Sequence, residues 1–318
     1  MKKALVTGCA GFIGSHMVDF LLKEGFVVLG IDNLSTGKLE FIYKHKKNKK
    51  FLFVKKDLIK DKIDSYFKKA EIIFHFAANA DVRYGIENRF RDIEQNIIGT
   101  YNVLEATIKH KVKIIVFAST GSVYGESKNF PTNEKEQFPI QTSLYANSKL
   151  AGEGLISSFC AAFDLKSFIF RFVSILGERY SHGHVFDFTK LLLLDNKKLK
   201  ILGDGNQKKS YLHVEDCISG IWRGLNYFKS NINIINLGTE NYINVKESAK
   251  IITKQLNFKP KMEFKGGKSG WVGDNPFILL DISKIKKSGW IPKYDIKESI
   301  ISTVNYLINN QWLFKIRK

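Results

Sequence analysis

Apolar runs of strand length recur along the first half of the chain, and helix-like stretches lie between them. The runs fall at residues 4–6, 26–31, 51–54, 71–78 and 112–117. Between the first two runs, Met17, Phe20 and Leu21 share one face of a helix predicted over 15–24, and a longer helical stretch is predicted over 87–110. Strands and helices that alternate in this way form right-handed crossover units. The pattern therefore predicts an α/β fold with a doubly wound parallel sheet.

The second half of the chain is less regular, with short elements joined by loops rich in glycine and lysine. Strands are expected at 168–172, 211–214 and 232–237, and helices at 185–194, 215–228, 245–256 and after Tyr294. We expect these elements to form a smaller α/β lobe that caps the carboxyl edge of the sheet.

Three glycines, Gly8, Gly11 and Gly14, follow the first strand. At this spacing glycines allow a tight turn, close approach of the backbone to a pyrophosphate, and close packing of a helix on a strand. A diphosphate would lie on the N–H groups of the helix N-terminus, which include those of Phe12 and Ile13. The triplet alone is weak evidence, because ordinary glycine-rich loops also contain it.

The second strand ends in Asp32, roughly 20 residues further on, where an acidic side chain can hold an adenosine ribose with Asn33 beside it. Together the glycines and Asp32 predict a Rossmann-like dinucleotide site. We therefore expect residues 1–172 to form a dinucleotide-binding domain. Residues 173–318 are then mainly a substrate-binding lobe, with segments near 211–240 returning to the first domain.

Two further strands end in residues suited to a ligand. Asp57 and Leu58 close the third run, where a carboxylate or the backbone can meet an adenine; a loop aspartate satisfied by its neighbours is the competing interpretation. Ala77 and Ala78 end the fourth run, and small residues at the carboxyl edge of a parallel strand leave room for a ligand. We expect His75 to be a packed, hydrogen-bonded histidine and not a catalyst.

A hydroxyl-rich segment, residues 118–125, follows the fifth strand, where ligands bind in open α/β sheets. Tyr145 then begins a long helix, and Lys149, four residues on, shares its face. Spacing alone carries no weight, because three other pairs match it: Tyr43 with Lys47, Tyr124 with Lys128, and Tyr242 with Lys246. The position of Tyr145 directly after the hydroxyl-rich loop singles it out.

Composition narrows the class of protein. The formal net charge is +19, but lysine rises together with isoleucine, asparagine and phenylalanine, and no recognition motif accompanies the charge, so we expect no nucleic-acid partner. The densest run, Lys44 to Lys50, is expected to be a solvated loop. No apolar stretch is long enough to span a membrane, and the three scattered cysteines lack metal-ligand spacing. We expect a cytoplasmic protein with free thiols and no metal.

The ordered motifs resemble those of the extended short-chain dehydrogenase/reductase superfamily, in particular the NAD-dependent epimerase/dehydratase family, over nearly the whole chain. The matching residues are the glycine triplet, Asp32, Asp57-Leu58, His75-Phe76-Ala77-Ala78, Asn96, Thr120, Val123-Tyr124-Gly125, Tyr145 with Lys149, and Tyr211-Leu212-His213-Val214 with Asp216. The resemblance implies bound NAD, a nucleoside-diphosphate sugar as substrate, and a homodimer built from two helices of each subunit. It implies cofactor contacts at Gly8, Gly11, Phe12, Ile13, Gly14, Asp32, Asn33, Asp57, Leu58, Ala77, Ala78, Asn96, Tyr145 and Lys149.

The chemistry of the matched residues agrees with this resemblance. Oxidation of a sugar alcohol needs a base, and a tyrosine with its usual pKa of about 10 is a poor one near neutral pH. Positive charge from Lys149 and from an oxidised nicotinamide ring would lower the pKa of Tyr145. Thr120 can hydrogen-bond the reacting oxygen.

The residues after Thr120 indicate the reaction. The dehydratases and decarboxylases of the family carry acidic residues there, whereas this chain has Gly121 and Ser122. Without an acid for elimination, the keto intermediate should receive its hydride back on the other face. We therefore expect epimerisation at C4 of a UDP-hexose or a UDP-N-acetylhexosamine.

Substrate contacts are expected from the resemblance at Ser122, Ser174, Lys209, Trp271 and Ile278. The chain departs from the family at two of these positions, because Ser174 replaces the usual asparagine and Trp271 the usual arginine. Lys209 stands where an arginine usually meets the diphosphate, and Ile278 falls near the residue that limits sugar size.

Three other functions compete with epimerisation. The chain can be a nucleotide-sugar reductase or dehydrogenase that releases its reduced cofactor, or a 4,6-dehydratase. A third, non-enzymatic hypothesis is a dinucleotide-binding scaffold with a basic surface. Intact Thr120, Tyr145 and Lys149 weigh against the scaffold.

Overall fold

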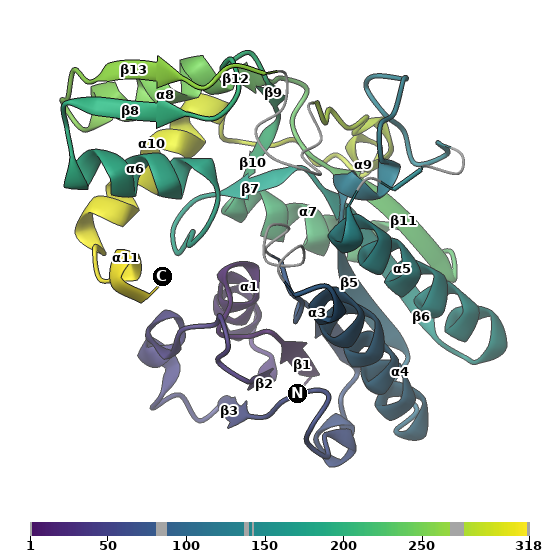
Figure 1. Ribbon diagram of the computed structural model, residues 1–318. Coiled ribbons are helices and arrows are strands. Elements are labelled where there is room, and N and C mark those ends of the chain that lie inside the picture. The colour runs from purple at the N-terminus through teal and green to yellow at the C-terminus, as the bar shows by residue number, and fades with distance from the viewer. Residues whose placement is uncertain (1, 81–87, 137–139, 142, 268–276, 317–318) are drawn as a thin grey trace. The chain divides into compact units, whose positions relative to one another are not determined.

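The computed structural model describes residues 2–80, 88–136, 140–141, 143–267 and 277–316. Its central feature is a seven-stranded parallel sheet in the order β11-β6-β5-β4-β1-β2-β3 (Figure 1). The strands are β1 (Lys3–Thr7), β2 (Val27–Asp32), β3 (Phe51–Lys55), β4 (Ile72–His75), β5 (Ile114–Thr120), β6 (Lys166–Phe172) and β11 (Ile232–Leu237). The predicted doubly wound α/β fold is confirmed.

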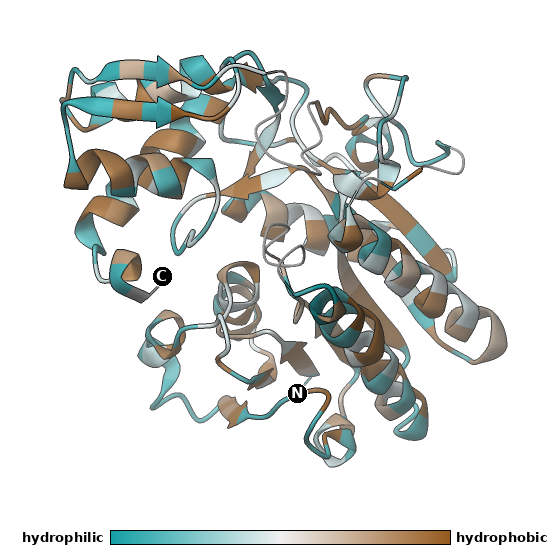
Figure 2. Cartoon of the chain, viewed as in Figure 1, coloured by the Kyte–Doolittle hydropathy of each residue, from teal (hydrophilic) through white to brown (hydrophobic). Residues whose placement is uncertain are grey.

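The order of the strands reverses at β1, which pairs with β2 on one side and β4 on the other. Ligands of open α/β sheets bind beyond the carboxyl ends of the strands at such a reversal. The ends of β1 and β4 therefore lie side by side, with Thr7 paired to His75. Most of β5 is hydrophobic in Figure 2, as expected for a parallel strand covered on both faces.

The helices that accompany the sheet follow the predicted periodicity, with shifts at their ends. They are α1 (Phe12–Lys23), α3 (Phe90–Asp92), the π-helix η4 (Ile93–Ile98), α4 (Gly99–Lys109), α5 (Leu144–Ala162) and α7 (Val214–Tyr227). The first helix begins three residues before its predicted start, directly at the glycine turn. Its Phe20 packs edge-on against Trp222 of α7, with ring centroids 5.2 Å apart.

The lysine-rich run at 44–50 is more ordered than the expected loop. It begins within a 3-10 turn, η2 (Tyr43–His45), and Lys44 and His45 both bond the carboxylate of Asp19 on α1. The chain also forms the 3-10 turns η1 (Leu39–Phe41), η3 (Asp64–Phe67) and η5 (Gly121–Tyr124). Local ion pairing therefore orders part of a stretch that its composition alone marks as solvated.

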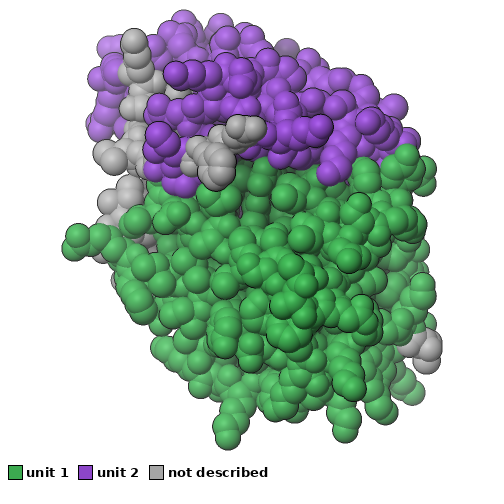
Figure 3. All heavy atoms as spheres, turned by 90° about the vertical axis from the view of Figure 1, so that its right-hand side faces the viewer, with its two compact units in different colours: residues 1–123, 143–171, 221–235 green, residues 124–142, 172–220, 236–318 purple. Residues whose placement is uncertain are grey.

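The chain divides into two compact units, coloured separately in Figure 3. Unit 1 comprises residues 1–123, 143–171 and 221–235, and unit 2 comprises 124–142, 172–220 and 236–318. The loop 124–142, which the sequence-based division placed with the first domain, groups with unit 2, where Thr132 forms a bridge to Leu280. The binding roles expected for the two parts stay predictions.

Unit 2 contains short paired strands and three helices that pack on one another, α6, α8 and α10. Its elements are β7 (Ser174–Leu176), α6 (His184–Leu194), β8 (Lys198–Ile201), β9 (Lys208–Lys209), β10 (Tyr211–His213), β12 (Ile243–Asn244), α8 (Val245–Gln255), β13 (Lys261–Phe264), α9 (Ser283–Lys286), α10 (Ile296–Asn309) and α11 (Leu313–Ile316). The pairs are β10 with β7, β12 with β9, and β13 with β8. In the described part of the chain, no helix is long and apolar enough to cross a membrane.

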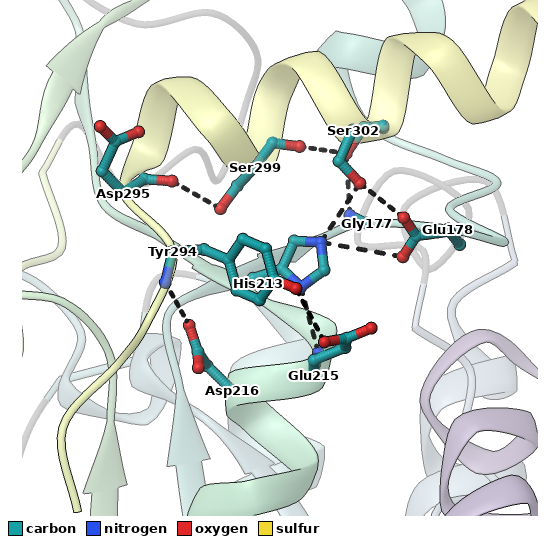
Figure 4. Close-up of polar contacts among 10 residues, drawn as sticks. Gly177, Glu178, His213, Glu215, Asp216, Tyr294, Asp295, Ser299 and Ser302 are labelled. Atoms are coloured by element: carbon teal, nitrogen blue, oxygen red, sulfur yellow. Dashed lines mark hydrogen bonds and ion pairs between the residues drawn. The ribbon is translucent and has the colours of Figure 1, made fainter.

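A buried histidine joins three elements of unit 2 (Figure 4). His213, at the end of β10, stacks on Tyr294 with ring centroids 4.0 Å apart, and its Nε2 lies 3.2 Å from the hydroxyl of Ser302 on α10. The carboxylate of Asp216 accepts hydrogen bonds from the N–H groups of Lys293 and Tyr294. These contacts fix the segment that leads into α10.

Candidate dinucleotide and catalytic site

The glycine turn is the first part of the candidate site, and the structure requires glycine at two of its positions. Gly8 has a φ of +69°, and a Cβ there would lie 2.7 Å from the backbone nitrogen of Ala77. A Cβ on Gly14 would lie 2.0 Å from the carbonyl oxygen of Gly8. The turn therefore packs against the end of β4 and against the first turn of α1.

The N-terminus of α1 has no side-chain cap. Gly11 is its N-cap, with extended backbone, and a Cβ there would lie 3.1 Å from the carbonyl oxygen of Gly8. The first N–H groups of a helix have no partner within the helix, and the helix dipole favours negative charge there. This end of α1 fits the pyrophosphate of a dinucleotide.

Asp32 lies beside this turn at the end of β2. Its carboxylate accepts hydrogen bonds from the N–H groups of Ala10, at 2.9 Å, and Leu34, at 2.8 Å. Burial raises the pKa of Asp32, and the two N–H groups act in the opposite direction. A Cβ on Gly37 would lie 2.7 Å from Oδ1, so the following loop passes close to the carboxylate. Asp32 is therefore rigidly held and keeps acceptor capacity for a ribose hydroxyl.

Asp57 and Asn33 are hydrogen-bonded to each other. Their contacts are compatible with both predictions for Asp57, an adenine contact and a loop aspartate satisfied by its neighbours. The carboxylate of Asp57 accepts a hydrogen bond from the amide of Asn33, at 2.9 Å, and another from the N–H of Ile59. Leu58 is buried, and its carbonyl oxygen accepts a hydrogen bond from Asn102 on α4. The aspartate is satisfied locally, and it also orders Asn33 beside Asp32.

His75 is the packed histidine that its sequence context indicates. It is fully buried at the end of β4, between the hydroxyls of Thr7 and Thr100, at 2.7 and 3.0 Å from its ring nitrogens. Burial, and to a smaller extent the charge of Lys149, lowers the pKa of His75 to about 3. A neutral ring bridging two hydroxyls supports the sheet edge where Ala77 follows.

Asn96 lies in the π-helix η4 and is 1% exposed. Its side-chain oxygen accepts a hydrogen bond from the N–H of Asn79, and its amide donates to the hydroxyl of Ser148 on α5. Asp92, also buried, accepts a hydrogen bond from the side chain of Asn79. Asn96 thus connects the segment after β4 to the helix that carries Tyr145. The sequence predicted Asn96 as a cofactor ligand and did not predict this connection.

The three predicted catalytic residues come together at the end of β5. Tyr145 lies in the first turn of α5, which Ser143 caps by accepting a hydrogen bond from the N–H of Ala146. The phenol of Tyr145 is hydrogen-bonded to Thr120. Lys149, one turn further along α5, is 2% exposed.

The electrostatics of this group bear on the expectation that Lys149 and an oxidised nicotinamide ring together lower the pKa of Tyr145. Burial, followed by the charge of Asp92, raises the pKa of Tyr145 to about 12, while the hydrogen bond with Thr120 acts in the opposite direction. Burial lowers the pKa of Lys149 to about 7, and Glu153 partly opposes that effect. The residues of the chain therefore leave the phenol protonated at neutral pH, and activation of Tyr145 requires additional positive charge.

The structure separates Tyr145 from the other tyrosines at the same spacing. Tyr43 and Tyr242 are 65% and 46% exposed. The ammonium of Lys208 lies over the ring of Tyr242, 4.7 Å from the ring centroid. Tyr124 is buried, but its hydroxyl donates to Asn236 at 2.8 Å.

Glu153 and Arg171 form an ion pair beside this group that the sequence reasoning missed. The carboxylate of Glu153 accepts hydrogen bonds from Arg171 Nε, at 3.0 Å, and from its terminal nitrogen, at 2.6 Å, and a further one from Ser119. The only signal in the sequence is that Glu153 follows Lys149 by four residues on one helix face.

The predicted substrate residues fall on both units. Ser122 is half-buried in unit 1, and its N–H donates to the hydroxyl of Thr120 at 3.1 Å. In unit 2, Ser174 is exposed at the start of β7, whereas Lys209 on β9 and Ile278 are half-buried. The charge of Lys209 acts on the half-buried His184, whose pKa is lowered to about 3, chiefly by desolvation. Trp271 lies outside the described residues.

Comparison with known proteins places the chain in a family. A family model described as the NAD dependent epimerase/dehydratase family matches residues 4–238. The chain belongs to this family. Its helix N-terminus, its glycine turn and its buried Asp32 fit the NAD that gives the family its name.

Relatives and solved structures of this epimerase/dehydratase family resemble the chain over nearly its full length. The UDP-glucuronate 4-epimerase of Thermodesulfobacterium geofontis is 34% identical, over 98% of each chain. The UDP-glucose 4-epimerase of Mycolicibacterium smegmatis is 31% identical, over 96% of this chain and 99% of its own. The structure of UDP-glucuronic acid 4-epimerase from Bacillus cereus, in complex with UDP-glucuronic acid and NAD, is 28% identical with a TM-score of 0.88, over 96% of this chain and 99% of that one.

Proposed function

We propose that this chain is a UDP-sugar 4-epimerase that works with bound NAD and produces no net oxidation. The observation that carries the proposal is the group of half-buried Thr120 and Tyr145 with buried Lys149, together with Gly121 and Ser122 in place of acids. A 4-epimerase needs one base that removes and returns a proton, and no separate acid for elimination. The relatives named UDP-glucose and UDP-glucuronate 4-epimerases support the same chemistry.

Each catalytic residue has a role that its contacts allow. Tyr145 takes the proton of the sugar hydroxyl and later returns it to the same oxygen, when the keto group is converted back to an alcohol. Thr120, already bonded to Tyr145, orients the reacting oxygen. Lys149 supplies positive charge to the phenolate and hydrogen bonds to the cofactor ribose. When bound, NAD accepts a hydride from the sugar and gives it back.

The remaining cofactor contacts are proposed for residues of unit 1. The turn from Gly8 to Gly14, with the N–H groups of Phe12 and Ile13, holds the pyrophosphate. Asp32 and Asn33 bind the adenosine ribose, and Asp57 with Leu58 lies beside the adenine. Ala77 and Ala78 leave room for the cofactor, and Asn96 acts on this site through Asn79 and Ser148.

Substrate recognition is proposed for five residues: Ser122, Ser174, Lys209, Trp271 and Ile278. Lys209 is assigned to the diphosphate, because ammonium groups bind phosphate as point charges. Ser174 and Ile278, both smaller than many alternatives, favour a site that accepts an N-acetylated hexose as well as a plain one.

The reaction is tested by incubating the protein with UDP-glucose, UDP-glucuronate and UDP-N-acetylglucosamine and separating the products. A deuterium at C4 of the sugar should reappear at C4 of the product, and no NADH should accumulate. A stable 4-keto-6-deoxy product with solvent deuterium at C5 would show a dehydratase instead. Steady release of NADH would show a dehydrogenase.

We further propose a homodimer formed by α4 and α5 of each subunit. Tyr101 on α4 is 45% exposed, and it packs edge-on against Phe159 of α5 with ring centroids 6.2 Å apart. Phe163, directly after α5, is 48% exposed and packs on Phe159. Clustered exposed aromatic residues are typical of protein interfaces.

A cytoplasmic location is supported by the three cysteines, which are all free thiols.

A further inference from the structure

The ion pair of Glu153 and Arg171 holds a carboxylate in place one helical turn after Lys149. Glu153 is 4% exposed, and Arg171 reaches it from β6 with two nitrogens of the guanidinium fork, at 3.0 and 2.6 Å. Ser119, from β5, donates to the same carboxylate. Three elements of unit 1 therefore fix one carboxylate a single helical turn after Lys149. A buried ion pair is a weak source of stability, so such a pair next to catalytic residues calls for another explanation.

Lys149 is in an environment that opposes its charge. It is 2% exposed, and its Nζ lies 3.9 Å from the ring centroid of Phe117. The face of an aromatic ring attracts an ammonium, but burial disfavours the charged form. The balance leaves the pKa of Lys149 at about 7, with Glu153 as the charge that raises it. Small changes in this balance therefore decide whether Lys149 is charged at neutral pH.

The other titratable groups facing this site do not replace Glu153. His75, on β4, stays neutral near pH 7, because burial holds its pKa at about 3. Asp92, on α3, acts on Tyr145, where its charge raises the pKa. Arg171, on β6, is a cation that pairs with the carboxylate of Glu153 at 2.6 Å and offsets part of its charge.

We propose that Glu153 is a positioning residue of the catalytic site, which keeps the ammonium of Lys149 charged beside Tyr145, and that Arg171 and Ser119 hold its carboxylate and limit its effect. Glu153 touches neither Tyr145 nor a reacting atom in this scheme and acts only through Lys149. The catalytic consequence rests on the function proposed above, whereas the effect on Lys149 is a property of the chain itself.

Two variants should shift the titration of Lys149 in opposite directions. Arg171→Met removes the cation that offsets part of the charge of Glu153, so Lys149 should become the main partner of Glu153 and titrate at higher pH. The double variant Glu153→Gln with Arg171→Met removes the whole pair and leaves no buried unpaired charge, so Lys149 should titrate at lower pH. A shift of about one pH unit or more is expected in each case.

The measurement is NMR of protein labelled with 13C at the lysine ε-carbons, with the Lys149 signal assigned by its loss in Lys149→Met. The same variants are then assayed for epimerisation across pH. The acid limb of the rate profile should move to higher pH in the double variant and to lower pH in Arg171→Met, because Lys149 stabilises the phenolate of Tyr145. Glu105→Gln, an exposed change of the same charge on α4, is the matched control and should move neither.

The outcomes separate the two proposals. Opposite shifts of the Lys149 midpoint without epimerase activity support the role of Glu153 and overturn the proposed function. Shifts in the same direction, or a double variant whose midpoint stays within the error of the native protein, overturn the role of Glu153 whatever the activity. The double variant decides the question alone if Arg171→Met does not fold.

Discussion

At the scale of single residues, the hydrogen bonds of His75 define which of its nitrogens carries the proton. The hydroxyl of Thr100 donates to the carbonyl oxygen of Asn96, at 2.6 Å, so it can only accept from His75 Nε2. Nδ1 is then free to accept from Thr7. A second proton on the ring would break that bond, in keeping with a pKa of about 3.

This arrangement predicts a loss of stability in acid. The unfolded histidine takes up a proton near its usual pKa of 6.5, whereas the folded one resists until about 3. The free energy of unfolding should therefore fall as the pH drops through that window, by about 1.4 kcal/mol for each unit of difference at most.

The test compares the native protein with His75→Gln in urea unfolding followed by circular dichroism between about pH 7 and pH 5. The variant should be less stable at neutral pH but lose less further stability on acidification. His184, whose pKa is also about 3, is common to both proteins and cancels in the comparison. Equal losses in the two proteins would contradict the prediction.

Tyr145 gives the second prediction at this scale. Tyr145→Phe should lower the rate of epimerisation roughly a thousandfold while folding and NAD binding persist, because it removes one hydroxyl and with it the proton acceptor. Product formation measures the rate, and cofactor binding is followed by fluorescence.

The matched controls are tyrosines with the same spacing to a lysine. Tyr43→Phe alters a 65% exposed side chain and should change neither rate nor stability. Tyr124→Phe removes the hydrogen bond to Asn236 and should cost about 1 kcal/mol of stability without a comparable loss of rate. A near-native rate in Tyr145→Phe would show that another residue is the base.

The predicted residues of the site share one property, which is that their signal is local in the sequence. Tyr145 and Lys149 are one helical turn apart, and Gly8, Gly11 and Gly14 form one turn. The pair of Glu153 and Arg171 spans 18 residues, and Ser119 lies 34 residues before Glu153. Their contact exists because β5 and β6 are neighbours in the sheet and α5 packs on β5, which one sequence does not show.

At the scale of elements, two glycines within helices, Gly14 of α1 and Gly154 of α5, should respond to alanine in opposite ways. A Cβ on Gly14 would lie 2.0 Å from the backbone oxygen of Gly8, whereas a Cβ on Gly154 of α5 would meet nothing within 4 Å. Gly14→Ala should destabilise the protein by about 2 kcal/mol and weaken NAD at least about tenfold, since the turn must shift.

Gly154→Ala is the control for helix propensity. It should stabilise the protein by up to about 1 kcal/mol and leave NAD affinity unchanged. Thermal unfolding with and without NAD measures both effects. If the two alanine variants behave alike, the close approach of Gly14 to Gly8 does not govern the turn.

Elements with a long periodic pattern were predicted from the sequence, whereas elements with a short pattern were missed. The helices α6 and α8 lie within a residue of their predicted bounds, because an apolar face determines them. The strands β8 and β13 were not predicted. Each strand has four residues: β8 contains two lysines, and β13 contains a lysine and a glutamate. The two strands pair with each other in a two-stranded sheet. Such strands are defined by their partner and not by their own pattern.

At the scale of the whole molecule, the alternation of strands and helices was enough to predict the sheet, but the sequence did not show that the loop 124–142 groups with unit 2. The loop 124–142 belongs to unit 2 through contacts that are distant in sequence. The side chain of Asn236 accepts a hydrogen bond from the hydroxyl of Tyr124 and donates hydrogen bonds to the carbonyl oxygens of Thr132 and Asp281. No local pattern marks Asn236 as the residue that holds these segments together.

The proposed homodimer gives the last prediction. The native protein should sediment as a dimer, because Tyr101, Phe159 and Phe163 offer an apolar surface on α4 and α5 that water covers poorly. Tyr101→Glu would place a charge in the interface and should yield a folded monomer with an unchanged circular dichroism spectrum.

The control is Leu52→Glu, which introduces the same charge at a 58% exposed leucine on the edge strand β3, away from α4 and α5 in the order of the sheet. It should remain dimeric in analytical ultracentrifugation at the same concentrations. A native protein that sediments as a monomer would refute the dimer. Dissociation by Leu52→Glu and not by Tyr101→Glu would instead place the interface at β3, where an open strand edge can pair with a second copy of the chain.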